Sequence, residues 1–221
     1  MNEMFQPESP LIRALTRTAD CIILNLLLMG MTVSIVLSGD GLVALYAVTL
    51  RMVRKEEGSI TKNYFRSVRC NFSASVPVTF ILMADVFILA ILYYSLRAEV
   101  LVMSPGKFVL LMTMAVVLTA FLSYLIPLTA RFDNSFAGHC GNALKLAVSN
   151  YPLTVMMTVI NMAPFLTVAM IPRLSAFFVP FWMTIGVAAG AYLNSYYLRR
   201  IFDKYTGNEE ENEQAYNGEQ L

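Results

Sequence analysis

The chain has 221 residues, of which 57% are hydrophobic and 14% are charged, and its formal net charge is +1. Its mean hydropathy is +0.60. The chain therefore holds more apolar side chains than the core of one soluble domain needs, and too few charges for a hydrated surface. This composition argues against an ordinary soluble protein and predicts an integral membrane protein.

The first apolar run extends from Cys21 to Ser38 and is followed by "SGDG" and a shorter apolar stretch, Gly41 to Val53. The first run is just sufficient to cross a bilayer, and it is too long for a cleaved signal peptide. The second would form only ~20 Å of helix against a hydrocarbon core of ~30 Å. We therefore expect a helix hairpin with "SGDG" as its outer turn, where glycines on both sides of Asp40 allow a tight reversal. Its second arm is expected to be short, tilted or partly re-entrant.

Four more stretches are long and apolar enough to span a membrane. They are Val76 to Leu96, Phe108 to Ala130, Leu153 to Ile171, and Ser175 to Leu198. The predicted fold class is an all-α membrane protein, a helical bundle of about six membrane segments. Five of these are full spans, beginning with Cys21 to Ser38, and one is the short or re-entrant arm.

The basic residues predict the orientation of this bundle. If the short arm returns to the side where the chain begins, only Arg97, Lys107 and Arg173 of the 16 basic residues lie outside. That distribution agrees with the excess of Lys and Arg found in cytoplasmic loops. We expect a multi-pass membrane protein with both termini in the cytoplasm and the lipid bilayer as its first partner.

Two segments between the spans have the pattern of cytoplasmic interfacial amphipathic helices. One begins near Ser59 and the other lies between Arg131 and Pro152. In the first, aromatic and basic residues are candidates for docking a partner or lipid: Tyr64, Phe65, Arg66, Arg69 and Phe72. After the membrane domain, residues 1–202, the polar and acidic segment 203–221 is expected to be a disordered cytoplasmic tail.

The run from Leu42 to Thr79 resembles the signature region of the YesL-like family of bacterial membrane proteins, a family of unknown function. In that family, a glycine-containing turn leads into a helix of the type "ALYYVTLKLVR", a charged turn, an aromatic-basic helix and an Asn-Phe pair. The matching residues here are Ala44, Leu45, Tyr46, Val48, Thr49, Leu50, Val53, Arg54, Glu57, Gly58, Phe65, Asn71 and Phe72. The segment from "RFDNSF" to "NYPLT" resembles the family's second cytoplasmic segment. Asp40 departs from the pattern, so no role for it follows from the resemblance.

The resemblance implies a cytoplasmic-membrane protein of Gram-positive-type bacteria, from a family often encoded beside carbohydrate ABC importers and polysaccharide-utilisation genes. It implies no mechanism.

Polar residues at membrane depth are the candidate sites: Asp85, Asn161, Asn25 and Asp40. An ionised Asp85 near the bilayer centre would cost at least ~2.5 kcal/mol unless it has a partner or is neutral. It either belongs to a transport pathway or holds helices together through a hydrogen bond to Asn161. Asn25, like Asn194, is interpreted as a helix-packing residue.

The sequence lacks recognised catalytic motifs and has one histidine, His139, and three cysteines without metal-site spacing. We expect no enzyme, no catalytic, metal or cofactor site, and no nucleic-acid partner.

Three functions remain. The first is an accessory protein of carbohydrate uptake that contacts subunits of an ABC transporter. The second is an autonomous small-molecule transporter using Asp85. The third and least favoured is an ABC permease subunit, because the Glu-Ala-Ala tripeptide typical of its coupling helix is missing.

Overall fold

The computed structural model describes residues 10–56, 58–97 and 103–218, with side chains between residues 11 and 204. All regular structure in these ranges is helical, which confirms the predicted fold class. In chain order the elements are α1 (Pro10–Thr32), η2 (Ile35–Leu37), α2 (Ser38–Arg54), α3 (Ile60–Arg97), α4 (Pro105–Arg131), α5 (Phe136–Ser149), α6 (Tyr151–Met170), η3 (Pro172–Leu174), α7 (Ser175–Phe181), the π-helical η4 (Trp182–Gly186) and α8 (Val187–Gly218).

Five helical stretches are long and apolar enough to cross a membrane, as expected, but the first differs from the predicted one. They are Ile35–Arg54, Ile60–Arg97, Pro105–Arg131, Tyr151–Met170 and Pro172–Lys204. The expected span from Cys21 to Ser38 is interrupted, because α1 ends at Thr32 and the chain is extended at Ser34. The apolar stretch that contains α2 is 72% buried, against 17–39% for the other four. The helix expected to be a short arm is therefore the central helix of the bundle.

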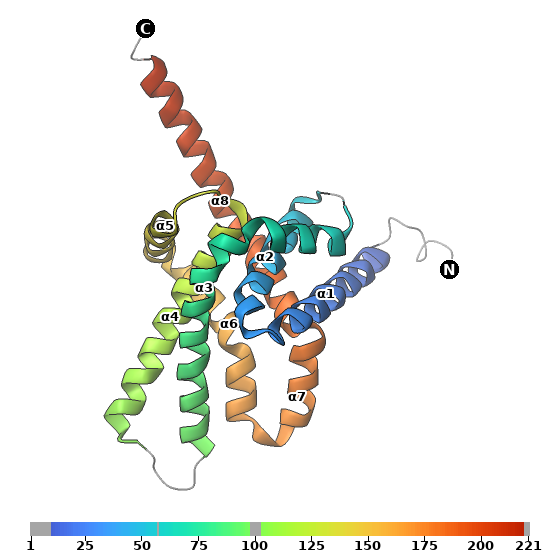
Figure 1. Ribbon diagram of the computed structural model, residues 1–221, viewed down its shortest axis with the longest axis vertical. Helices are drawn as coiled ribbons and strands as arrows, with labels where there is room; N and C mark the ends of the chain where they lie inside the picture. The colour runs from blue at the N-terminus through green and yellow to red at the C-terminus, as the bar shows by residue number, and fades with distance from the viewer. Residues whose placement is uncertain (1–9, 57, 98–102, 219–221) are drawn as a thin grey trace.

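"SGDG" forms the first turn of α2 and lies inside the bundle, which corrects the expectation that it forms an outer turn. Ser38, Gly39, Asp40 and Gly41 are all buried, and Gly39 packs against Thr79 of α3. Thr79 precedes the end of α3 at Arg97 by 18 residues, which corresponds to ~27 Å of helix. The hairpin therefore turns well short of the end of the bundle where α3 and α4 are connected (Figure 1).

Helix α3 combines two predicted elements. The amphipathic segment and the following span form one continuous helix with Pro77 inside it. Its first turns run across the view before the helix turns down along α4 (Figure 1). Proline removes one backbone hydrogen bond and typically bends a helix instead of ending it when neighbouring helices hold both halves. The second amphipathic segment does form a separate helix, α5, which ends before Pro152 in the first turn of α6.

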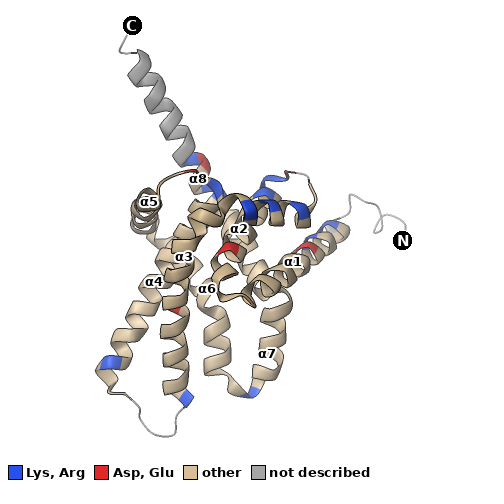
Figure 2. Ribbon diagram, in the orientation of Figure 1, with Lys and Arg blue, Asp and Glu red and all other residues tan. Residues whose placement is uncertain are grey.

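Charge divides the molecule into two ends (Figure 2). Arg97, Lys107 and Arg173 belong to the connections α3–α4 and α6–α7 at the lower end. The other described basic residues gather at the upper end, from which α8 projects. Helix α8 continues through Gly218, so the segment expected to be disordered has a helical backbone up to that residue. Within it, four Glu residues and Gln214 between positions 209 and 214 have good helix propensity.

Candidate functional site

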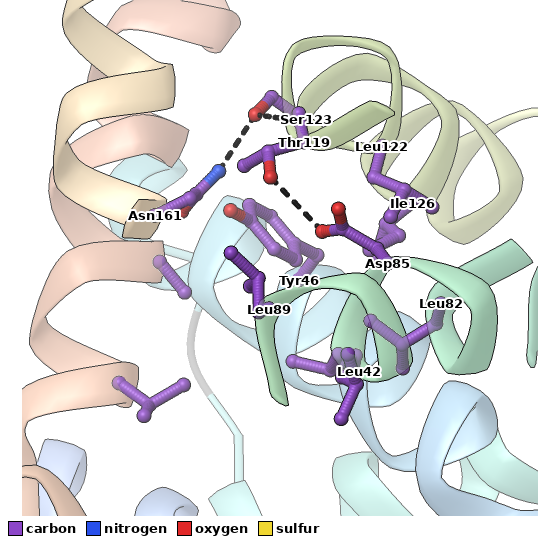
Figure 3. Close-up of a pocket in the computed structure, with 13 residues that line it drawn as sticks. Leu42, Tyr46, Leu82, Asp85, Leu89, Thr119, Leu122, Ser123, Ile126 and Asn161 are labelled. Atoms are coloured by element: carbon purple, nitrogen blue, oxygen red, sulfur yellow. Dashed lines mark hydrogen bonds between the residues drawn. The ribbon is translucent and has the colours of Figure 1, made fainter. Parts of the chain in front are cut away.

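A cavity of about 190 Å³ lies in the middle of the bundle, between α2, α3, α4, α6 and α8. Leucine, isoleucine, valine and alanine side chains form most of its wall. Five polar side chains complete the wall, and Figure 3 shows how they converge: Tyr46, Asp85, Thr119, Ser123 and Asn161. An apolar pocket with a few converging polar groups is the usual form of a small-molecule site.

Asp85 is the only acidic residue in this wall, and it is 5% exposed. One carboxylate oxygen, Oδ2, accepts a hydrogen bond of 2.9 Å from the Thr119 hydroxyl. The other, Oδ1, is buried and has no hydrogen-bond partner among the described residues. No Lys or Arg within the described ranges forms an ion pair with it. The carboxylate is thus half satisfied and lies beside the cavity.

A chain of amides and hydroxyls crosses the bundle next to Asp85. Asn161 donates to the Ser123 hydroxyl at 2.7 Å (Figure 3). Asn194 donates to Oδ1 of Asn161 at 2.8 Å and to the Tyr46 hydroxyl at 3.1 Å. These bonds join α2, α4, α6 and α8. Because a hydrogen bond inside a low-dielectric interior is strongly directional, this chain fixes the positions of the polar groups around the cavity.

The structure brings Asp85 and Asn161 to one cavity without the direct hydrogen bond considered from the sequence. Thr119 and Ser123 of α4 lie between them, four residues apart and therefore on one face of the helix. These two residues and Tyr46 were missed by sequence reasoning. The signal that could have found them is the spacing of Thr119 and Ser123, an i, i+4 polar pair in an otherwise apolar span.

The cavity changes what Asp85 can do. A cavity of this volume can hold several water molecules, and intramembrane acids are tolerated where they face such a space. The free Oδ1 can accept a hydrogen bond or contact a cation, while the neighbouring amides and hydroxyls can donate and accept hydrogen bonds. The arrangement suits a small polar solute, a cation or a proton.

Asn25 lies outside this cavity and is fully buried. Its Nδ2 donates to the carbonyls of Trp182 and Met183 at 3.0 and 2.7 Å, and its Oδ1 accepts from the Ala188 amide at 2.9 Å. A π-helical stretch disturbs the regular pairing of backbone groups. Asn25 therefore binds the backbone of η4 and the start of α8, the packing role interpreted from the sequence.

Asp40 is also outside the cavity wall. It lies in the first turn of α2 and is 1% exposed, and neither carboxylate oxygen has a described hydrogen-bond partner. The positive end of the α2 dipole favours a negative charge in this turn. The three cysteines are free, and the described residues contain no group of three or more His, Cys, Asp or Glu side chains that could hold a metal ion.

The docking candidates on α3 divide into two groups. Tyr64 is fully buried and donates to the carbonyl of Gly41 at 3.2 Å. It therefore packs α3 against the hairpin and is not available for docking, contrary to the expectation from the sequence. Phe65 and Phe72 are 52% and 46% exposed. Arg66 and Arg69 are exposed as well. These four side chains, Phe65, Arg66, Arg69 and Phe72, form what we call the aromatic-basic face of α3.

Comparison with known proteins gives one family match. Residues 21–96 match the profile of the family described as "Protein of unknown function, DUF624". This range contains the second half of α1, all of α2 and nearly all of α3, including Asp85. No curated protein and no solved structure matches the chain.

Proposed function

We propose that the chain is a non-enzymatic protein of a bacterial cytoplasmic membrane, of the YesL-like type, with both termini in the cytoplasm. Support comes from the five apolar helices and from the concentration of basic residues at one end of the bundle. Cytoplasmic loops are the ones enriched in Lys and Arg.

Within that membrane, we propose that the protein binds and moves a small polar solute through the cavity beside Asp85. The observation that carries this proposal is the unpaired, buried Oδ1 of Asp85 in a cavity that also presents Tyr46 and Asn161. A purely structural Asp85 would be expected to satisfy both oxygens, since an unsatisfied buried polar group costs free energy.

The test uses purified protein in proteoliposomes that contain a pH-sensitive dye, to which monosaccharides, disaccharides and small amines are added in turn. Asp85→Asn keeps the shape of the side chain and the contact with Thr119. It should therefore abolish any solute-dependent signal and lower stability by about 1 kcal/mol or less. A wild-type signal that survives in Asp85→Asn would contradict the proposal.

A second candidate is an accessory role in carbohydrate uptake through contact with ABC transporter subunits. The aromatic-basic face favours it, because two exposed phenylalanines beside arginines at the basic end of the bundle are suited to a partner or to lipid headgroups. If this role is correct, Phe65→Glu with Phe72→Glu should remove a co-purifying transporter after mild detergent extraction. Asp85→Asn should leave that complex intact. An ABC permease subunit remains the least favoured alternative.

A further inference from the structure

Two adjoining cavities at the basic end of the bundle suggest a second site, unrelated to Asp85. Their volumes are about 210 and 190 Å³, and they share Arg51 of α2 and Arg131 of α4 in their walls. We call them together the basic cleft. Arg54 and Glu56 line one cavity, and Arg66 and Asp133 line the other. Four arginines therefore face two carboxylates, which leaves the cleft positively charged.

Arg131 is held rigidly in this cleft. Its guanidinium carbon lies 5.0 Å from the centre of the Phe132 ring and 5.3 Å from that of Phe202, and its Nη2 contacts Asp203 at 3.3 Å. Only 16% of its side chain is exposed. Nevertheless, its Nη1 is buried and has no hydrogen-bond partner in the described part of the chain. A fixed guanidinium with one free nitrogen is a pre-organised anion donor.

Neighbouring carboxylates do not account for the remaining charge. Asp203 is shared between Arg54, Arg131 and Arg199 at 2.6, 3.3 and 3.5 Å. Glu56 lies 4.0 Å from Arg51 and 3.9 Å from Arg54, which is the outer limit of an ion pair.

Helix C-termini explain part of the basic content, since Arg51, Arg54 and Arg131 each lie in a last helical turn. Arg66 lies in the second turn of α3, where a positive charge gains nothing from the helix dipole. Its position in the cleft therefore calls for another reason. Beside it, Asn63, Ser67 and Asn71 add uncharged polar groups to the same wall.

We propose that the basic cleft binds a phosphate group, through Arg51 and Arg131 with Arg66 at its edge. Arginine guanidinium groups pair with phosphate oxygens in a planar, two-pronged geometry that spherical anions such as chloride do not match. The phosphate belongs either to an anionic lipid headgroup or to a soluble phosphorylated compound, because in the orientation proposed above the basic end of the bundle lies where lipid headgroups and water meet.

The test measures saturable binding of radiolabelled inorganic phosphate to the full chain in a neutral detergent, at constant ionic strength set with chloride. Arg131→Gln and Arg51→Gln should each weaken binding by about ten- to a hundredfold, the effect of losing one hydrogen bond to a charged group. Lys62→Gln removes the same charge from an exposed position in the first turn of α3, outside the cleft and outside the aromatic-basic face, and it should bind as wild type.

Competition distinguishes the two sources. Phosphatidylglycerol in mixed micelles displaces the label best if the ligand is a lipid headgroup, and glycerol phosphate does so best if it is soluble. Wild-type protein without saturable binding would overturn the proposal, and so would a Lys62→Gln variant that weakens binding as much as Arg51→Gln. If Arg131→Gln does not yield a monodisperse protein, Arg51→Gln decides alone, because the Arg51 side chain is 45% exposed and its removal should disturb packing less.

Discussion

Gly39 and Thr79 are in direct contact where the start of α2 crosses α3. A Cβ added to Gly39 would lie 2.9 Å from the Cα of Thr79, closer than real Cβ contacts allow. The Thr79 hydroxyl also reaches the carbonyl of Val36 at 3.5 Å. This close approach holds the α1–α2 hairpin against the middle of α3, the helix that also carries Asp85.

Gly39→Ala should therefore destabilise the protein by about 1–3 kcal/mol, the usual cost of adding a methyl group to a packed site. Gly30→Ala is the matched control, because nothing lies within 4 Å of the Cβ it would add and it is exposed on α1. In a helix interior this control should be neutral or stabilising by up to ~1 kcal/mol. Thermal unfolding in detergent measures both. Equal unfolding temperatures for Gly39→Ala and wild type would contradict the close contact.

The depth of the hairpin predicts a labelling pattern in a variant whose three cysteines are replaced by serine. Val33 lies at the turn and is 87% exposed, but in a half-deep hairpin it faces lipid. Val33→Cys should resist a membrane-impermeant maleimide from either side of intact membranes. Arg173→Cys should be labelled from outside the cell, and Glu56→Cys only after the membrane is opened. Labelling of Val33→Cys from outside as rapidly as Arg173→Cys would mean that the hairpin crosses the membrane.

Sequence reasoning succeeded where a property is local. The apolar stretches that became α3, α4 and α6 were recognised by length and composition, and the separation of Arg97, Lys107 and Arg173 from the other basic residues follows from their positions between spans. The amphipathic α5 was also found, because its period is independent of its neighbours.

The remaining features depend on contacts between distant segments. The hairpin packs against α3 at the level of Thr79 through Gly39, and these two residues are 40 positions apart in the sequence. That α3 continues through Pro77 could not be read from the residues next to it, because a proline inside a helix is tolerated only where neighbouring helices hold both halves. The cavity unites Asp85, Ser123 and Asn161 from three helices, and hydropathy does not predict how these helices rotate about their axes. Asp85 and Asn161 could be chosen as candidates, but their connection through α4 could not.

His139 should make stability depend on pH. It is 3% exposed on α5, and burial lowers its pKa below the ordinary value of 6.5, although the nearby Asp133 acts in the opposite direction. The folded protein therefore favours the neutral imidazole, and its stability falls as pH drops from the ordinary pKa of 6.5 to the lowered pKa of the folded state. From pH 7 to pH 5, the unfolding temperature of wild type should fall more than that of His139→Gln. Parallel declines would show that His139 has the same pKa in both states.

Asn25 should contribute more to stability than an ordinary intramembrane hydrogen bond. Its side chain bonds three backbone groups of η4 and α8, at Trp182, Met183 and Ala188. In Asn25→Leu, a leucine of similar size replaces the asparagine, and the three buried backbone groups lose their hydrogen bonds to its side chain. This loss should cost about 3 kcal/mol. A typical hydrogen bond between membrane helices contributes only ~0.6 kcal/mol.

Thr113→Val provides the control for that substitution, because Thr113 is exposed and its hydroxyl bonds, among the described residues, only the Val109 carbonyl of its own helix. It should change stability by less than ~0.5 kcal/mol. Hydrogen exchange separates a local effect from a global one: peptides covering residues 182–190 should exchange faster in Asn25→Leu while α4 remains protected. If Asn25→Leu and Thr113→Val unfold at the same temperature and exchange alike, the backbone of η4 is stable without Asn25.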